Sequence, residues 1–207
     1  MTIYNLKPFF QNLLRPLVVS LQKYGVTANQ VTLSAMFLSI TVGLLLSLFP
    51  STSFYWLLPI FLFIRMALNA VDGMLAREYH QKSHLGAIYN ELGDVISDVA
   101  LYLPFCFLPN INNVSLLVIL FLAILTEFIG VLALMIGASR RYDGPMGKSD
   151  RAFIFGAYGL IIAFFPSTLS WSHYLFLIVI ILLLITCYQR VVKALHEIKP
   201  TEQPQSK

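Results

Sequence analysis

Ionisable side chains lie inside apolar stretches of the 207-residue sequence, where a charge is costly unless it has a partner or a chemical task. They are Arg65, Asp72, Glu91, Asp94, Asp98 and Glu127. Arg65, Asn69 and Asp72 follow one another at steps of four and three residues. Asn90, Asp94 and Asp98 follow at steps of four. Side chains at such steps share one face of a helix, so the sequence predicts two polar helix faces.

A short basic loop separates these two helices, which predicts antiparallel neighbours whose polar faces meet near one end of the protein. Carboxylate and amide oxygens converging from two helices suit a hard cation such as Mg²⁺, Mn²⁺ or Ca²⁺. The competing interpretation is an internal network of ion pairs. We favour metal binding for Asp72 and Asp94. We favour ion pairing for Arg65, Asp98 and Glu127, with Arg65 paired to Asp98 or to Glu127.

Small and basic residues accompany the carboxylates. Gly73 and Gly86 would let a bulky ligand approach the backbone, although close helix packing explains a lone glycine equally well. Arg77 could clamp a phosphate through two hydrogen bonds, or it could simply fix the orientation of its helix. His80 and His84 lack the further thiolate or imidazole ligands that zinc requires, so we interpret them as solvated loop histidines.

The composition is that of a membrane protein. Hydrophobic residues make up 57% of the chain and charged residues 12%, whereas soluble domains contain about 25% charged residues. This balance excludes a soluble enzyme, a disordered chain and a disulfide scaffold. Six apolar runs could each cross a bilayer. They are 31–49, 54–77, 85–108, 114–138, 152–165 and 174–188. We therefore predict an all-α polytopic membrane protein with six transmembrane helices.

The basic residues alternate between the connections. The loops 50–53, 109–113 and 166–172 contain no Lys or Arg, while the other connections and the terminal segments carry every Lys and Arg except Arg65. The positive-inside rule then places both termini in the cytoplasm. In so apolar a chain, the net charge of +4 sets topology and does not indicate nucleic-acid binding.

We expect three segments. Residues 1–24 alternate apolar and polar side chains at helical spacing, which predicts an amphipathic helix lying along the cytoplasmic membrane interface. Residues 25–199 form the membrane domain. Residues 200–207 are polar and form a tail.

A signature runs through the two polar helices. It reads Asn69-x2-Asp72-Gly73-x2-Ala76-Arg77-x8-Gly86-x3-Asn90-x3-Asp94. This resembles the signature of the CDP-alcohol phosphatidyltransferases, D-x2-D-G-x2-A-R-x8-G-x3-D-x3-D, at every spacing. The segment from Thr27 to Thr32 resembles the family's P-N-x-x-T start of the first span, with Asn29 in place and Ala28 instead of proline. The whole chain is similar to a bacterial inner-membrane subgroup of this family.

The resemblance implies a phospholipid-synthesis transferase that moves a phosphatidyl group from CDP-diacylglycerol, or a similar CDP-lipid, to an alcohol and releases CMP. It implies two divalent metals, Mg²⁺ or Mn²⁺, held by the four acid positions, and the last acid as general base. Carried over by position, the metal ligands are Asn69, Asp72, Asn90 and Asp94, and the base is Asp94. The substrate-binding positions are Asn29, Gly73, Ala76, Arg77, Ser83 and Gly86. A homodimer and contacts with membrane lipids are also implied.

Two of the four acid positions hold asparagine. Asn69 and Asn90 can ligate a metal through their amide oxygens, but they supply no negative charge. Four carboxylates neutralise two divalent cations, and two do not. Glu91 and Asp98 lie nearby and would restore the missing charge if they completed the ligand set. The number of metals and the extent of activity therefore stay open.

A basic, glycine-containing stretch, 140–151, lies on the same side as the signature. It could bind a phosphate of the acceptor, or touch anionic lipid headgroups. We favour headgroup contact for Arg140 and Arg141. Lys148 and Arg151 lie where the fifth span begins, so we expect them at the substrate site.

Two other classes of protein compete with an active transferase. The first is a family member that binds nucleotide lipid without turnover, which the two asparagines favour. The second is a small membrane transporter, since buried charges also mark ion paths. Neither a polar path across the full depth of the bundle nor an inverted repeat is visible, so transport is the weaker alternative. The acceptor alcohol cannot be read from the sequence.

Overall fold

The computed structural model describes residues 6–198, and this part of the chain is helical with no strand. The helices are α1 (Leu6–Lys23), α2 (Ala28–Leu48), α3 (Leu57–Glu78), α4 (His84–Tyr102), α5 (Asn113–Met135), α6 (Lys148–Phe164) and α7 (Ser172–Ile198). Short 3-10 turns are η2 (Thr52–Phe54), η3 (Leu103–Phe107) and η4 (Pro166–Trp171). The all-α prediction is confirmed. The predicted tail, 200–207, lies outside the described residues.

Capping side chains set the helix starts that border the site. The Thr27 side chain accepts a hydrogen bond from the Gln30 amide, and the Gln30 side chain accepts one from the Thr27 amide, which fixes the start of α2. Ser83 caps α4 by accepting a bond of 2.9 Å from the Gly86 amide. Asp150 accepts a bond of 3.0 Å from the Gly147 amide at the start of α6. These caps place the first turns of α2, α4 and α6 at defined positions.

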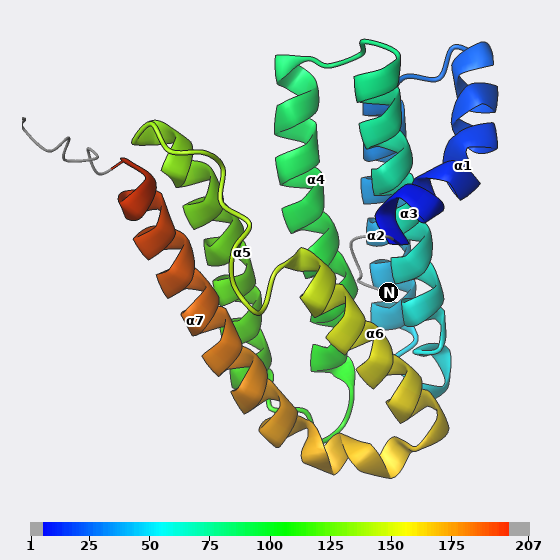
Figure 1. The fold of residues 1–207 in the computed structure, drawn as a ribbon. Helices are drawn as coiled ribbons and strands as arrows, with labels where there is room; N and C mark the ends of the chain where they lie inside the picture. Colours follow the sequence, from blue (N-terminus) through cyan, green and yellow to red (C-terminus); the bar gives the residue numbers. More distant parts are fainter. Residues whose placement is uncertain (1–5, 199–207) are drawn as a thin grey trace, which may run out of the picture.

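The helices form two groups that meet at one end (Figure 1). Helices α2, α3 and α4 lie together beside α1, α5 runs alongside α7, and α6 packs against α3. At the closed end, aromatic side chains from several helices fill the core. Tyr102 and Phe155 stack at 4.2 Å between ring centroids, and Tyr55 meets Phe105 edge-on at 4.8 Å. The opposite, polar end carries the charged loops and stays open.

Four helical segments are long and apolar enough to cross a membrane: 28–48, 52–78, 113–135 and 166–198. The prediction of six spans is thus supported in part. Helix α4 does not qualify because it carries Glu91, Asp94 and Asp98 on an otherwise apolar helix, and α6 is only 17 residues long. Both nevertheless pack within the bundle (Figure 1), so crossing by all six remains our prediction.

Helix α1 lies against α3 at the side of the bundle (Figure 1). Phe10 meets Phe63 edge-on at 5.9 Å, and Arg15 pairs with Glu78 at 2.8 Å. Leu13 and Leu17 remain exposed. A helix with one packed face and exposed leucines agrees with the predicted amphipathic segment, and its seat at the membrane interface remains a prediction.

Buried ion pairs hold the polar half of the bundle together. Asp98 on α4 accepts hydrogen bonds from Arg65 on α3 at 2.8 Å and from Arg151 on α6 at 2.9 Å. The predicted pairing of Arg65 with Asp98 is therefore confirmed. Arg151 is 1% exposed and also donates to Glu127 on α5 at 3.0 Å. Arg190 on α7 lies 3.4 Å from the same Glu127 carboxylate. The network thus joins α3, α4, α5, α6 and α7.

We predict that removing Arg151 destabilises the protein far more than removing an exposed arginine. Arg151→Met leaves Asp98 and Glu127 buried with one cation fewer, which should cost about 3 kcal/mol. Arg15→Met is the matched control because its ion pair with Glu78 is half-exposed, and it should cost less than about 1 kcal/mol. Thermal unfolding of both variants in detergent measures the difference. Equal melting temperatures would contradict the structural role of Arg151.

We also predict the topology from the alternation of basic loops. Single-cysteine variants of the full chain, made after replacing Cys106 and Cys187, should react with an impermeant thiol reagent from outside at some loops only. Ser51→Cys, Asn113→Cys and Ser167→Cys should be labelled in intact cells. Lys82→Cys and Tyr142→Cys should be labelled only after the membrane is opened. Labelling of Lys82→Cys in intact cells would refute the proposed orientation.

Candidate active site

A cavity of about 580 Å³ opens between the start of α2, the end of α3 and the start of α4. Eight of the predicted site residues line it: Asn29, Asp72, Gly73, Ala76, Arg77, Ser83, Gly86 and Asn90. Ala28, Thr32, Gln81, Lys82, His84 and Ala87 complete the lining. The spacing of the signature therefore gathers most of its positions around one opening at the polar end of the bundle.

Two glycines let polar side chains lie close to the backbone at the mouth of this cavity. A Cβ atom at Gly86 would lie 2.7 Å from Asn29 Oδ1 and 3.0 Å from Ser83 Oγ, closer than side-chain carbons approach such atoms. A side chain there would displace Asn29 and the Ser83 cap together. At Gly73 a Cβ would lie 3.0 Å from Arg77 Nη1, so the Arg77 guanidinium lies over the bare backbone of α3. Both glycines keep polar groups close to the cavity wall.

Asp72 presents a buried carboxylate to the cavity. Its side chain is buried, and Thr32 Oγ1 on α2 lies 2.7 Å from Asp72 Oδ2. Thr32 belongs to the segment that resembles the start of the first span, but its contact with Asp72 was not predicted. Gln81, also unpredicted, accepts a bond of 2.7 Å from the Ala28 amide and joins the loop before α4 to α2. Its sequence neighbourhood carries no signal for this contact.

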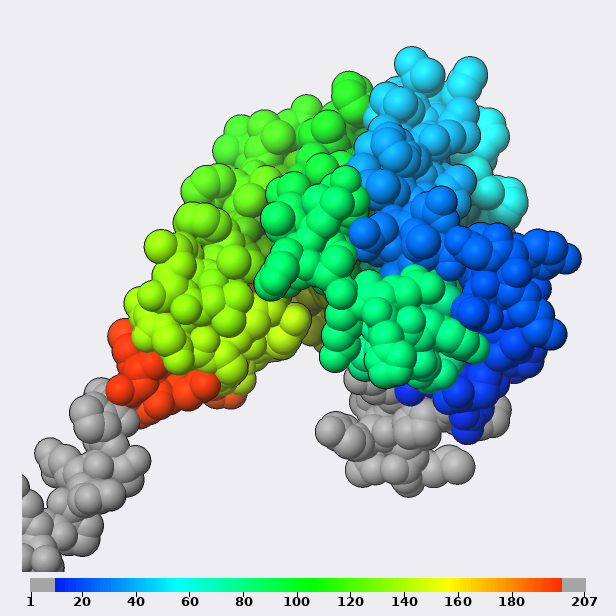
Figure 2. Space-filling model, turned by 90° about the horizontal axis from the view of Figure 1, so that it is seen from above, coloured from blue at the N-terminus to red at the C-terminus, as the bar shows by residue number. Residues whose placement is uncertain are grey.

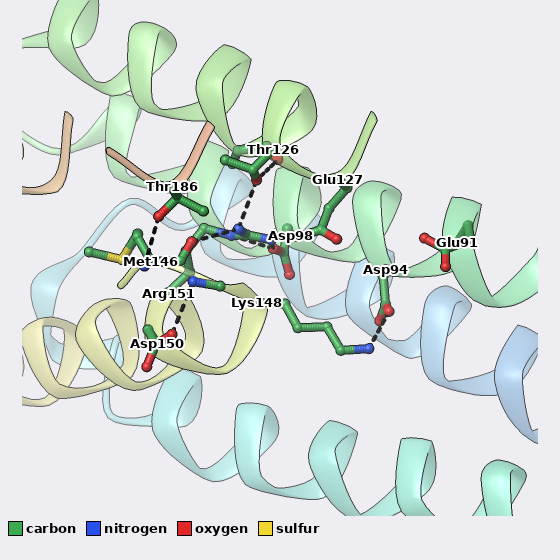
Figure 3. A network of polar contacts seen from close by, with 12 residues as sticks. Glu91, Asp94, Asp98, Thr126, Glu127, Met146, Lys148, Asp150, Arg151 and Thr186 are labelled. Carbon is green, nitrogen blue, oxygen red and sulfur yellow. Dashed lines mark hydrogen bonds and ion pairs between the residues drawn. The ribbon is translucent and has the colours of Figure 1, made fainter. Parts of the chain in front are cut away.

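Asp94 lies beyond this cavity, in contact with two cations. Lys148 Nζ lies 2.5 Å from Asp94 Oδ2, and the Lys148 side chain extends toward Asp94 in Figure 3. Arg65 Nη2 lies 3.1 Å and Asn69 Nδ2 3.2 Å from Asp94 Oδ1. Asp94 lines a small hollow that shares Thr32 and Asn90 with the main cavity. Both oxygens of the predicted base are thus hydrogen-bonded to donors.

The two acids that could restore charge to the ligand set are engaged elsewhere. Glu91 accepts hydrogen bonds from Arg140 Nε at 2.7 Å and Nη2 at 2.5 Å. Asp98 is held between Arg65 and Arg151. Figure 3 shows Asp98 next to Arg151, while Asp94 faces Lys148. The suggestion that Glu91 or Asp98 completes a metal site is therefore not supported by this arrangement.

A second cavity, of about 460 Å³, lies between α3 and α6. Its walls are mainly apolar: Pro59, Leu62, Phe63, Met66, Ala152, Phe153, Gly156, Ala157 and Leu160. Arg65, Asn69, Lys148 and Ser149 form its polar part. Seen from the polar end of the bundle, the surface is hollowed near its middle, with part of α6 at the bottom (Figure 2). Lys148 and Asn69 thus border this cavity and also contact Asp94.

The loop before α6 is fixed by ion pairs and does not present free guanidinium groups. Arg140 pairs with Glu91 and Glu127. Burial opposes the ionisation of Asp143 in this loop, but hydrogen bonds from Lys193 and Arg141 outweigh it and lower the pKa of Asp143. Because Arg141 donates one of these hydrogen bonds, its guanidinium is also engaged by a side chain of the protein.

The stretch 140–151 therefore divides into two parts. Lys148 reaches the site, where it pairs with Asp94. Arg151, which we expected to contact substrate, instead lies in the bundle interior and lines neither large cavity. Its guanidinium donates hydrogen bonds to Asp98, Glu127, Thr126 and the Met146 carbonyl oxygen. We accordingly assign Arg151 a positioning role, because it anchors the helix that begins with Lys148.

The donor set is sparse for metal ions. Among residues 6–198, no three His, Cys, Asp or Glu side chains come close enough to hold one ion. The groups available at the signature are two carboxylates, Asp72 and Asp94, and the amide oxygens of Asn69 and Asn90. Oxygen donors of this kind suit one hard cation with water as additional ligand. These groups lack the negative charge needed to neutralise two divalent cations.

The sequence matches a model of the family described as CDP-alcohol phosphatidyltransferase over residues 25–194. It is 56% identical over 190 residues to the inner membrane protein YnbA of Escherichia coli (strain K12), covering 92% of this chain and 94% of that protein. It is 34% identical over 133 residues to an uncharacterized protein of Aquifex aeolicus (strain VF5), covering 59% of this chain and 61% of that one.

Solved structures show the same fold. Phosphatidylinositol phosphate synthase (PgsA1) of Mycobacterium tuberculosis with CDP-DAG bound superposes with a TM-score of 0.75, at 21% identity, covering 91% of this chain and 96% of that one. The same enzyme in complex with manganese and citrate gives a TM-score of 0.74, covering 91% of each chain. The helical arrangement, the site and the family match over most of the sequence agree: this chain belongs to the CDP-alcohol phosphatidyltransferase family.

Proposed function

We propose that this protein transfers a phosphatidyl group from CDP-diacylglycerol, or a closely similar CDP-lipid, to an alcohol, with release of CMP. The observation that carries the proposal is the 580 Å³ cavity, around which six signature positions converge together with Asn29 and Ser83. The membership in the family and the CDP-DAG bound to PgsA1 support a CDP-lipid as the donor. Mg²⁺ or Mn²⁺ is the proposed cofactor, and the manganese in the PgsA1 complex supports this choice.

The nucleotide would occupy the main cavity. Arg77 lies over Gly73 and could offset the charge of the diphosphate through paired hydrogen bonds. Asn29 and Ser83 place polar oxygen atoms against the backbone of Gly86 in the cavity wall, where they could hydrogen-bond a base or ribose. Asp72 and the amide oxygens of Asn69 and Asn90 would hold the cation. When bound, that cation polarises the phosphoryl oxygens and stabilises the leaving CMP.

Asp94 would act as the general base. The acceptor oxygen forms a bond to the lipid-side phosphorus, the bond from that phosphorus to the CMP oxygen breaks, and the hydroxyl proton passes to Asp94. In the structure Asp94 Oδ2 is held by Lys148 at 2.5 Å. The incoming hydroxyl must therefore replace the ammonium at Oδ2, which leaves Lys148 free to contact an oxygen of the acceptor or of the phosphate.

The second cavity suits the lipid part of a substrate. Its apolar walls between α3 and α6 would face acyl chains, while Lys148 and Arg65 lie at the end nearest Asp94. A CDP-lipid could thus place its diphosphate at the site with its chains in the bilayer. We also propose that the acceptor is an alcohol, that the protein forms a homodimer, and that both termini lie in the cytoplasm. The E. coli relative is named as an inner membrane protein, which supports the same location here.

A second candidate function is binding of nucleotide lipid without turnover. The pairing of Asp94 with Lys148 and Arg65 favours it, because both oxygens of the proposed base are already occupied by hydrogen-bond donors. The neutral Asn69 and Asn90 favour it as well. The two candidates share the cavity and differ in one measurable product, CMP.

We predict that Asp94→Asn lowers CMP release by about 100- to 10,000-fold, because the amide cannot take the proton of the acceptor. The matched control is Asp143→Asn, which changes a carboxylate in the loop before α6 and should leave the rate unchanged. CMP is measured with purified protein, CDP-diacylglycerol and a panel of alcohols, and the lipid product is identified by mass.

The outcomes separate the candidates. Loss of CMP release in Asp94→Asn alone supports the transferase. Unchanged release in Asp94→Asn would refute Asp94 as the base. No CMP from the wild-type protein with any alcohol, together with saturable binding of CDP-diacylglycerol, would establish the binding protein instead.

A further inference from the structure

The charge at the signature differs from what two metal ions need. Full-motif members carry four carboxylates at these positions, and four negative charges balance two divalent cations. Here Asn69 and Asn90 are neutral, so Asp72 and Asp94 supply two charges. The neighbouring carboxylates Glu91 and Asp98 are neutralised by arginines. The deficit is therefore not compensated by acids around the site.

The positive charge that a second metal would bring is already present beside Asp94. Lys148 Nζ contacts Oδ2 at 2.5 Å, and Arg65 Nη2 contacts Oδ1 at 3.1 Å. A divalent cation on either oxygen would meet a like charge at short range, or would have to displace it. Arg65 cannot move away easily because Asp98 also holds it, at 2.8 Å.

The chain holds Lys148 in place while leaving it reachable. Lys148 is the first residue of α6, whose start is capped by Asp150 and anchored by the buried Arg151. Its side chain is nevertheless 37% exposed and borders the α3–α6 cavity. An ammonium group in this position can contact a phosphate from the side of Asp94 and the α3–α6 cavity.

Asp72 differs from Asp94, because among residues 6–198 no Lys or Arg forms an ion pair with its carboxylate. Its hydrogen-bonding partner is the Thr32 hydroxyl at 2.7 Å, which is neutral. Asp72 also lines the main cavity together with Asn90. This is where a carboxylate remains available to a metal.

We propose that the site takes one divalent cation, held from the Asp72 side, and that the Lys148 ammonium supplies the second positive charge to the diphosphate. The inference rests on the proposed function in so far as that function needs a cation. It assigns Lys148 to the place where a full-motif enzyme would hold its second metal.

Counting bound ions tests the inference without catalysis. Purified full-length protein in detergent is titrated with Mn²⁺, alone and with CDP, and free Mn²⁺ is measured by electron paramagnetic resonance. We expect one Mn²⁺ per chain and no spin coupling between two ions. Asp72→Asn should lose this ion, with at least a tenfold weaker affinity, and the matched control Asp143→Asn should retain it.

A gain-of-site variant makes the test sharper. Lys148→Met combined with Asn69→Asp and Asn90→Asp restores four carboxylates and removes the competing ammonium. It should bind two Mn²⁺ per chain and show the broadened signal of a coupled pair. The melting temperature of each variant is measured first, and Lys148→Arg, which keeps the charge, provides a folded comparison that should still bind one ion.

The outcomes distinguish the inference from the function. Two Mn²⁺ per wild-type chain, or no Mn²⁺ with or without CDP, would overturn the single-cation site. One Mn²⁺ without any CMP release would leave the inference standing and refute the transferase. For an active wild type, Lys148→Met should lower CMP release about 100-fold, with Lys148→Arg recovering part of it. Unchanged release in Lys148→Met would overturn the role of the ammonium.

Discussion

The buried guanidinium of Arg151 is the interaction on which the polar half of the protein depends. It lies between Asp98 on α4 and Glu127 on α5, and it is carried by α6. Charges taken out of water are stable only when they are fully paired and hydrogen-bonded, so each partner fixes the position of the others. The three helices therefore cannot shift independently at this level of the bundle.

This constraint reaches the site through Lys148 and Arg65. Lys148 lies one helical turn before Arg151, and Arg65 shares Asp98 with it. Both cations are thereby directed at Asp94. The position of the proposed base is thus a consequence of the ion pairs behind it as much as of the signature that contains it.

Much of the fold and the site could be predicted from the sequence, since both follow from local patterns. Apolar runs located all six helices, although α4 ends six residues before its run and α7 continues ten residues beyond its run. Asp72, Gly73 and Arg77, carried over from the family signature, line one cavity. Asp98 was one of the two partners expected for Arg65, but the arginine partners of the other acids could not be predicted in the same way. Asp98 follows Asp94 at the same step as Asp94 follows Asn90, so it resembled a spare ligand. Asp98 is paired with Arg151, which lies 53 residues away along the chain, and no local pattern indicates this contact.

The role of Arg151 was misjudged for the same reason. Its neighbour in sequence, Lys148, reaches Asp94, but Arg151 lies three residues further along the same helix, about 4.5 Å deeper along the axis. The hydropathy of α4 likewise does not decide whether this helix crosses the membrane. The charges that lower its hydropathy are neutralised by partners on other helices. The role of Arg151 and the place of α4 both depend on contacts between segments that are distant in the sequence.

The two cavities lie at different heights along α3 and differ in polarity. One is bounded by polar loops at the end of the bundle, and the other by apolar side chains along its flank. Molecules that dissolve in water and molecules that dissolve in the bilayer can thus approach the polar groups around Asp94 by separate routes. Under the proposed reaction, CMP could depart into the aqueous phase while the new phospholipid diffuses sideways into the membrane, so neither product would have to wait for the other.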